Sequence, residues 1–447
     1  MSPAVSEITE SRHIYTHRRE KLLLTVAGVF LAVSVWALAV GRQAPEPDKT
    51  GLIADPVLLL CLALWFGAAL SGHVGLQHLR PGRDAILFPA VMTLCGWGTI
   101  TIWRLQGDYA LRQAVWVCIG TAAMLVTLRW FHLLRAWRKY PYVSLLFGAL
   151  LTALTVVMGV SPTGAGPRLW LGFGEISWLG AGVFLQPSEL LKPLLAIFLA
   201  EYISRHRALV HGQLDGFSAR LPVAFLAPII VMWGLSMLMV VIQRDLGAGW
   251  VLYWGLLGIF FLSTGRGRYV IFGFVLFIVG TAFAYFASDL VRFRFNGWIN
   301  PWSDPYGDYY QIIQSIHAID AGGIVGYGIG NGTASNIPLA HSDYIFAAIV
   351  NEWGKLGACA LLTLTLLVIQ RIYRITFSQP TGSAIQILVL GVGVFIAVQA
   401  TVNIAGIVRA LPLTGVTLPF VSYGGSSMFV GFIGIGLVFG SSESKQQ

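Results

Sequence analysis

Four aspartates and two histidines stand in one long polar stretch, residues 296–354, of a chain that is otherwise mostly apolar. They are Asp304, Asp308, His317, Asp320, His341 and Asp343. Carboxylates and imidazoles can accept or give up a proton during a reaction. A loop on a rigid scaffold keeps such groups accessible, and a loop of this length is more often functional than connective. We therefore predict an outward-facing active site in this stretch, with Asp343 at its centre.

Several of these side chains also have a structural interpretation. Asp343 comes just before an apolar run, where a carboxylate is an expected N-cap of a helix. Position alone favours capping over catalysis. Asp304 and Asp308 stand among turn residues and are expected to cap backbone groups there. His341 fits a polar residue at a helix mouth.

The composition excludes a soluble protein. Of the 447 residues, 56% are hydrophobic and 11% are charged, against about 25% charged in a soluble domain. The apolar runs last about 18 to 25 residues, the length of a spanning helix, and lack the alternation of a membrane β-barrel. The four cysteines lie inside these runs without metal or redox spacing, so we interpret them as small apolar residues. The predicted fold class is an all-α polytopic membrane protein.

About twelve spanning helices are expected after a polar N-terminus. Residues 1–20 are predicted to form a short disordered cytoplasmic tail. No signal peptide is evident, because the first apolar run is long and lacks a small-residue cleavage site. The expected spans lie at about 22–40, 52–72, 84–103, 111–128, 141–160, 188–204, 221–242, 246–264, 269–287, 344–370, 384–408 and 425–441.

Lysine and arginine between the runs set the orientation. With the N-terminus inside, 18 basic residues fall in cytoplasmic segments and 9 in outer ones, as the positive-inside rule requires. Both termini are then cytoplasmic, and a large extracytoplasmic loop lies between the ninth and tenth helices. The net charge of +9 is therefore a topological signal, and no nucleic-acid partner is predicted.

Within the polar stretch, the pattern predicts one short helix and one close approach of the backbone. Ile312, Ile313, Ile316 and Ile319 share a helical face, which predicts a helix over residues 309–319. Six glycines follow within residues 322–332. No strand–turn–helix context supports a nucleotide loop, so close approach to a ligand or to another segment explains the glycines better.

Three other outer segments, residues 166–193, 242–249 and 411–427, place polar groups beside apolar runs. Irregular backbone at membrane depth is tolerated only next to protein or a watery cavity, so all three are expected to line the same outward cavity as the long loop. Glu189 and Lys192 could be functional or could be a helix pair that holds the bundle together. Glu352 and Lys355 have the same two interpretations.

Taken together, these motifs resemble the SEDS family of FtsW, RodA and SpoVE, membrane glycosyltransferases that polymerise peptidoglycan from lipid II. In family order they are Arg168 and Trp170, then QPSELLK (186–192), RDLG (244–247), NPWSDPYGDYYQIIQS (300–315), AIDAGGIVGYGIGNG (318–332), HSDYIFAAIVNEWGKLGA (341–358) and PLTGVTLPFVSYGGSS (412–427). The resemblance implies a ten-helix bundle at 84–441 with a catalytic loop at 288–343. A cytoplasmic tail and two extra helices at 1–83 would precede it, and a tail at 442–447 would follow.

The resemblance implies that Asp343 is the catalytic carboxylate, because it matches the aspartate of the family's His-Ser/Thr-Asp motif. It also implies substrate contacts by Arg168, Trp170, Gln186, Ser188, Glu189, Lys192, Asp245, His341, Glu352, Ser422, Gly424, Gly425 and Ser426. Three positions depart from the family pattern: Asn351 stands where many members have a glutamate, Arg244 replaces a proline, and Ala321 replaces a serine. On position, Asp245 fits a structural or substrate-orienting role better than catalysis.

The implied reaction extends a lipid-linked glycan with the sugar of lipid II at the outer face of the bacterial cytoplasmic membrane. Asp343 would take the proton of the acceptor 4-hydroxyl. Arg168 and Lys192, with or without a divalent cation such as Mg²⁺ or Mn²⁺, would stabilise the pyrophosphate that departs. No other cofactor is required, because the lipid substrate is already activated. The resemblance also implies a class B penicillin-binding protein as partner. No extracytoplasmic domain large enough for crosslinking is evident in this sequence, so crosslinking is expected to come from that partner.

Two other functions stay open from the sequence. A lipid II flippase would use a similar cavity but would need access from both sides of the membrane. A secondary transporter would show inverted repeats with broken helices in corresponding halves, and no convincing internal repeat is found.

Overall fold

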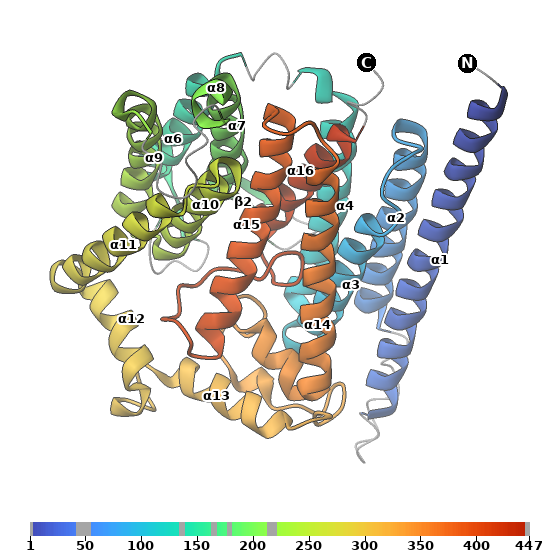
Figure 1. Ribbon diagram of the computed structural model, residues 1–447. Helices are drawn as coiled ribbons and strands as arrows, with labels where there is room; N and C mark the ends of the chain where they lie inside the picture. Colours follow the sequence, from blue (N-terminus) through green and yellow to red (C-terminus); the bar gives the residue numbers. More distant parts are fainter. Residues whose placement is uncertain are drawn as a thin grey trace. The chain divides into compact units, whose positions relative to one another are not determined.

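Twelve helices at the predicted positions dominate the fold. The computed structural model in Figure 1 describes residues 3–41, 55–133, 139–161, 168–176, 181–211 and 221–442. The helices are α1 (Pro3–Gly41), α2 (Pro56–Leu79), α3 (Leu87–Leu105), α4 (Gly107–Arg129), α6 (Pro141–Met158), α7 (Leu191–Arg205), α9 (Val223–Ile242), α10 (Leu246–Thr264), α11 (Gly267–Ala287), α14 (Ile345–Phe377), α15 (Ala384–Ile407) and α16 (Gly425–Ser441). The predicted all-α polytopic fold is confirmed.

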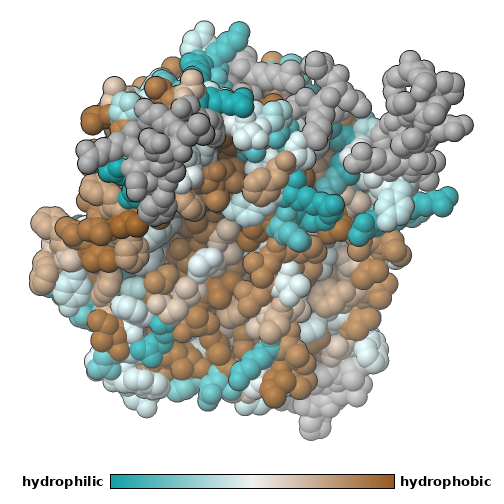
Figure 2. All heavy atoms as spheres, in the orientation of Figure 1, coloured by the Kyte–Doolittle hydropathy of each residue, from teal (hydrophilic) through white to brown (hydrophobic). Residues whose placement is uncertain are grey.

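Nine helices in the described residues are long and apolar enough to cross a membrane. The remaining three are α3, α7 and α16; α7 has 15 residues and α16 has 17, fewer than the roughly 20 of a full crossing. Hydrophobic residues spread over much of the face shown in Figure 2. Only 6% of the most apolar stretch of α11 is buried inside the protein. Apolar helices left uncovered in this way are suited to lipid, so the chain is a multi-pass membrane protein.

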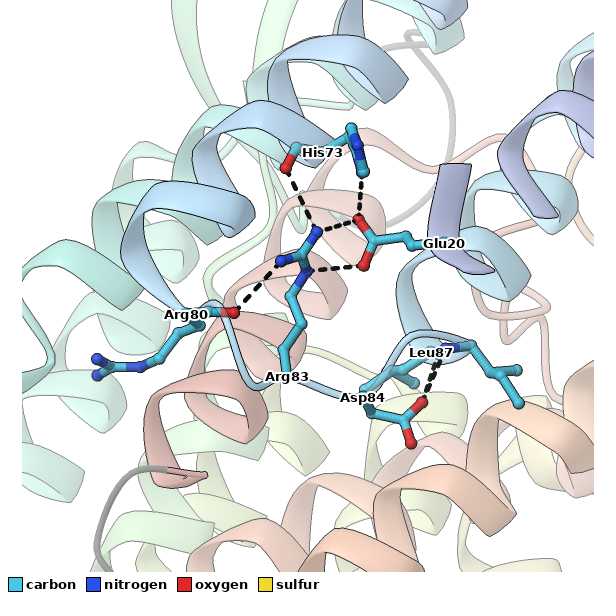
Figure 3. A network of polar contacts seen from close by, with 7 residues as sticks. Glu20, His73, Arg80, Arg83, Asp84 and Leu87 are labelled. Carbon is cyan, nitrogen blue, oxygen red and sulfur yellow. Dashed lines mark hydrogen bonds and ion pairs between the residues drawn. The ribbon is translucent and has the colours of Figure 1, made fainter. Parts of the chain in front are cut away.

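The predicted disordered tail is wrong for its described residues, because α1 already begins at Pro3. A helix that has nucleated in a packed run extends at little cost, and its polar part has a specific anchor. Glu20 is fully buried; it accepts hydrogen bonds of 2.7 and 2.6 Å from Arg83 and lies 2.7 Å from Nδ1 of His73 (Figure 3). These contacts connect α1 to His73 of α2 and to the segment that follows α2, and the desolvation of two buried charges offsets much of their attraction.

A short antiparallel hairpin, β1 (Leu171–Ile176) and β2 (Ala181–Leu185), was not predicted. Leu171 pairs with Leu185 and Glu175 with Gly182, with an irregularity between them. Just before the hairpin, Trp170 forms an isolated bridge to Val160. The 3₁₀ turn η3 (Pro187–Leu190) then leads into α7.

The long polar stretch contains more helix than predicted. The helix expected at 309–319 is confirmed as α13 (Tyr310–Gly322), and α12 (Asp289–Ile299) precedes it. Two 3₁₀ turns, η5 (Pro301–Ser303) and η6 (Ala334–Asn336), complete the stretch. Asp304 caps the turn after η5 by accepting the N–H groups of Gly307 (3.1 Å) and Asp308 (2.9 Å), which confirms its structural interpretation.

The chain forms two compact units, which we describe separately. Unit 1 comprises Met1–Arg129, Pro301–Arg371 and Thr417–Gln447; unit 2 comprises Trp130–Asn300 and Ile372–Val416. In unit 1, α4 packs on α2 and α16, and α1 packs on α3. Gly120 permits the α4–α16 contact, because a Cβ there would lie 2.5 Å from the Phe432 ring. In unit 2, α15 packs on α7 and α10, and α6 packs on α7 and α9.

Candidate active site

Backbone bonds within unit 1 hold the segment that carries Asp343. The Tyr423 N–H donates to the His341 carbonyl (2.9 Å), and the Ser422 hydroxyl donates to the Ser342 carbonyl (2.6 Å). Ser422 is itself fixed, because its hydroxyl accepts the Leu418 N–H at 2.9 Å. The structure therefore brings three predicted site residues, His341, Asp343 and Ser422, into one framework.

Asp343 lies at the entrance of α14 but not at the position of its N-cap. The helix begins at Ile345, and the Ala348 N–H donates to the Tyr344 carbonyl (3.2 Å). The N-cap residue is defined by such a first bond, so Tyr344 takes that place and Asp343 directly precedes it. The Asp343 side chain is half-buried. The N-terminal end of a helix favours a negative charge, which suits an ionised carboxylate here.

His341 forms a cluster of three rings with Tyr109 and Tyr423, whose own centroids are 4.8 Å apart. It stacks on Tyr109 with a centroid distance of 4.5 Å and lies 5.6 Å from the ring of Tyr423. Burial lowers the pKa of His341 to about 4, because desolvation disfavours the charged form. The imidazole beside Asp343 in the chain is thus neutral near pH 7 and cannot serve as a cation for a phosphate group.

Two residues of this region were missed by the sequence analysis. Tyr109 lies under His341, and the Arg112 guanidinium lies 5.2 Å from the centre of the Tyr109 ring. Burial raises the pKa of Tyr423, although the neighbouring Arg112 opposes that shift. Tyr109 and Arg112 stand at the start of an otherwise apolar run, residues 107–129. That position could have marked them as candidate site residues.

Glu352 is engaged inside the protein. It is 4% exposed, lies 3.2 Å from Nε of Arg104 and accepts the Gly330 N–H at 3.2 Å. The alternative of a Glu352–Lys355 helix pair is wrong in its geometry, because Gly354 between them has a non-helical φ of 67° and kinks α14. The i,i+3 neighbour relation holds only within a regular helix.

The last predicted residues of unit 1 stand where α16 begins. A Cβ at Gly425 would lie 2.2 Å from the Trp116 indole, and one at Gly424 would lie 3.1 Å from Thr417. Both glycines therefore allow close packing at the entrance of the helix. Ser426 follows in the first turn and is buried.

In unit 2, four predicted residues form a polar cluster. Lys192 forms an ion pair with Glu189 and donates to the Gln399 side chain (2.7 Å). Gln186 donates to Asp245 (2.9 Å). The predicted Glu189–Lys192 pair is confirmed as a contact. Its cation is already balanced by a carboxylate.

Asp245 has a structural role in this cluster. Its carboxylate caps α10 by accepting the Ala248 N–H at 3.0 Å. Burial raises the pKa of Asp245, and the charge of Glu189 acts in the same direction, while the bonds from Ala248 and Gln186 oppose the shift. Ser188 nearby in the sequence is 2% exposed, and its hydroxyl has no hydrogen-bond partner among the described residues.

Arg168 and Trp170 do not take part in the hydrogen bonds and ion pair described for this cluster. Arg168 is exposed and Trp170 is half-buried next to the hairpin. The predicted residues thus fall into one group in unit 1 and one in unit 2. The idea that both line one cavity stays a prediction. No group of three or more His, Cys, Asp or Glu side chains in the described part of the chain could hold a metal ion.

The fold and the geometry around Asp343 define a polytopic helical membrane protein with a carboxylate held at the entrance of a helix. This chain belongs to the FtsW/RodA/SpoVE (SEDS) family of cell cycle proteins, whose model matches residues 86–447.

Similar proteins support that assignment. The peptidoglycan glycosyltransferase RodA of Mycobacterium tuberculosis is 33% identical over 94% of this chain and 89% of its own length. Stage V sporulation protein E of Bacillus subtilis is 30% identical over 75% of this chain and 87% of its own length. A solved structure of a peptidoglycan synthase complex matches with a TM-score of 0.64 and 24% identity, over 81% of this chain and 98% of the other. The rod shape determining protein RodA of Thermus thermophilus matches with a TM-score of 0.57 and 22% identity, over 81% and 97%. These two likenesses establish the fold.

Proposed function

We propose that this chain is a peptidoglycan glycosyltransferase that polymerises lipid II into β-1,4-linked glycan strands for cell shape or division, with Asp343 as the general base. The relatives named as peptidoglycan glycosyltransferases support the reaction class. The observation that carries the role of Asp343 is its setting, a half-buried carboxylate on backbone tied by Ser422 and Tyr423.

The proposed reaction is a single displacement. The oxygen of the acceptor 4-hydroxyl attacks the anomeric carbon of the donor sugar while its proton passes to Asp343. The bond between that carbon and the diphosphate breaks, and undecaprenyl diphosphate leaves with the electron pair. One inversion turns the α-linked donor into a β bond, so no covalent enzyme intermediate is needed.

Two cations remain candidates for the diphosphate. Arg168 is exposed and can reorient toward a phosphate oxygen. Lys192 is buried and paired with Glu189, so it would have to share or exchange that partner to stabilise a leaving group. A divalent cation, where one takes part, would take most of its ligands from substrate oxygens, because the described residues offer no cluster for it.

Polymerisation of purified lipid II by the reconstituted protein tests the proposal against a flippase. Glycan strands should form in detergent, where no bilayer separates two compartments. Transbilayer movement of lipid II in vesicles without any glycan product would favour the flippase.

The proposed location is the cytoplasmic membrane, with both termini inside and the 288–343 loop outside. The excess of basic residues in the inner segments supports it. A cysteine in place of the exposed Ser335 should react with an impermeant thiol reagent from outside, and one in place of His211 should not. The reverse labelling pattern would overturn this orientation.

The proposed partner is a class B penicillin-binding protein that crosslinks the strands. The fold match to a member of a peptidoglycan synthase complex agrees with such an assembly. Co-purification with a transpeptidase, and faster polymerisation by the complex, are the expected results. Complete crosslinking by this chain alone would contradict the division of labour.

A further inference from the structure

The glycine-rich loop that leads to Asp343 is bonded to the backbone of α14 on both sides of its kink. On one side, the N–H groups of Tyr327 and Gly328 donate to the carbonyls of Asn351 and Glu352, each at 3.0 Å. On the other side, residues 355 and 356 donate to the carbonyls of residues 323 and 324 at 3.1 Å. Gly326 permits this approach, because its φ is +84° and a Cβ there would lie 2.2 Å from the Glu352 carbonyl oxygen.

Asn351 joins three elements through its side chain. It is fully buried. Its amide oxygen accepts the Thr333 N–H at 2.8 Å, and its amide nitrogen donates to the Ala318 carbonyl of α13 at 2.8 Å. Only a side chain with both a donor and an acceptor can make this pair of bonds. A Cβ at Gly332 would lie 2.4 Å from the same amide oxygen, so the loop is packed directly against Asn351.

A charged pair holds the neighbouring residues of the loop. Arg104 donates to the carbonyls of Gly330 (3.1 Å) and Gly332 (3.0 Å), while Glu352 accepts the Gly330 N–H. Arg104 and Glu352 also pair with each other at 3.2 Å. The Gly330 N–H is thus occupied by a carboxylate of the protein itself. We interpret these bonds as anchoring the loop to α14.

The anchored residues bracket the segment of Asp343. Thr333 precedes Asp343 by ten positions, and Asn351 follows Asp343 by eight positions, within the first two turns of α14. The segment 333–343 therefore starts at a bond to Asn351 and ends just before the first turn of the same helix. The position of Asp343 is limited by its covalent connection to α14, and the position of Thr333 is fixed by its hydrogen bond to Asn351.

We propose that Asn351 is a positioning residue for glycan polymerisation, which fixes the start of segment 333–343 and thereby the place of the Asp343 carboxylate. Arg104 and Glu352 act with it by holding Gly330 and Gly332. The proposal rests on the proposed role of Asp343 as the base. A base displaced by about 1 Å can lose on the order of 100-fold in rate.

The test separates kcat from KM in lipid II polymerisation. In Asn351→Ala, we expect kcat to fall by about 10–100-fold while KM stays within about twofold, because the base moves but the remaining substrate contacts do not. Asn351→Asp should behave similarly, since it keeps an acceptor for Thr333 but loses the donor for Ala318. Hydrogen exchange should accelerate at the amides of Gly330 and Thr333.

A double variant covers the possibility that the Asn351 variants fail to fold, and a further variant serves as the control. Arg104→Gln/Glu352→Gln weakens the same clamp without changing Asn351 and leaves no buried charge unpaired, so it should show the same selective loss of kcat. Asn403→Ala is the matched control. It removes a buried asparagine of unit 2 that donates to the Val416 carbonyl at 2.6 Å, and it should lower the melting temperature without the loss of kcat.

The outcomes separate this inference from the proposed function. Full activity in Asp343→Asn would refute the proposed base itself. An inactive Asp343→Asn together with unchanged kcat in the Asn351 variants and in the double variant would refute only the positioning role. Equal losses of kcat in Asn351→Ala and Asn403→Ala, at equal melting temperatures, would reduce Asn351 to general stability and would also overturn the inference.

Discussion

The candidate residues of unit 1 and those of unit 2 are held in opposite ways. The backbone of the Asp343 segment is held by neutral groups, namely backbone carbonyls and N–H groups and a serine hydroxyl, and the nearby imidazole of His341 is neutral. Around Lys192, the supports are charged and polar side chains: Glu189 forms an ion pair with Lys192, and the neutral Gln186 donates to Asp245. Asp343 is half-buried, whereas Lys192 is 9% exposed.

This difference suits the Asp343 group to catalysis and the Lys192 group to stabilising the fold. A general base must keep its own charge available while its backbone stays fixed, and neutral supports achieve both. A buried cation with a carboxylate partner contributes little net charge to a substrate, but removing one member leaves the other buried and uncompensated. We therefore expect changes at Asp343 to affect rate without stability, and changes at Lys192 to affect both.

The largest expected effect is that of Asp343→Asn. An amide cannot take the proton of the acceptor hydroxyl, so polymerisation should fall by about 10²–10⁴-fold. Asparagine has nearly the same size and keeps one acceptor oxygen, so the melting temperature should stay nearly unchanged. The measurement is glycan product from purified lipid II alongside thermal melting.

Asp304→Asn is the matched control for that experiment. Asp304 is an exposed aspartate earlier in the polar stretch whose carboxylate only caps a turn, and asparagine caps about as well. It should keep its activity. Normal product from Asp343→Asn would remove the distinction between the two carboxylates and the assignment of the active site.

The next effect is on stability, in Lys192→Met. Glu189 would lose its partner in a buried place, and breaking such a pair costs about 3–5 kcal/mol. The double variant Glu189→Gln/Lys192→Met leaves no charge unpaired and should recover most of the lost melting temperature. If the double variant also recovers activity, Lys192 does not contact the substrate; if only stability returns, it does.

His341 gives a smaller, pH-dependent effect. Its folded pKa of about 4 lies below the 6.5 of the unfolded chain. Between these values the unfolded state binds a proton that the folded state does not, so stability is complete above about pH 6.5 and falls as the pH drops. At pH 5 the loss is about 2 kcal/mol.

Thermal melting between pH 7.5 and 4.5 measures this loss, with His341→Gln as the comparison. The variant keeps a neutral planar group among the aromatic rings but cannot titrate. Its melting temperature should fall less on acidification than that of the unchanged protein. Parallel curves would show that His341 is not buried as a neutral group.

The sequence predicted those parts of this comparison that depend on local pattern. Spans were found because bilayer thickness sets their length. The cap by Asp304 followed from turn chemistry, and the glycine cluster indicated a close backbone approach, which the contact of Gly326 with Glu352 confirms.

Contacts between residues far apart in the sequence could not be predicted. Arg104 and Glu352 are both charged residues beside apolar runs, but nothing local pairs them across such a separation. The kink at Gly354 also could not be predicted, and it removes the i,i+3 neighbour relation that was expected between Glu352 and Lys355. The β1–β2 hairpin is rich in glycine, which has low strand propensity, so its strands arise from pairing rather than from local preference.

The smallest expected effect is that of Asp245→Asn, and it tests whether the polar cluster of unit 2 uses its charge. The carboxylate caps α10 and accepts from Gln186, and burial already raises its pKa. Asparagine caps a helix about as well as aspartate, so the loss in stability should stay under about 1 kcal/mol. Activity should stay within about threefold, in contrast to the same substitution at Asp343.

Asp245→Ala, which removes the cap, should cost about 1 kcal/mol and sets the scale in the same melting experiment. A hundredfold loss of polymerisation in Asp245→Asn at an unchanged melting temperature would mean that a second carboxylate takes part in the reaction, and the contrast between the two groups would no longer hold.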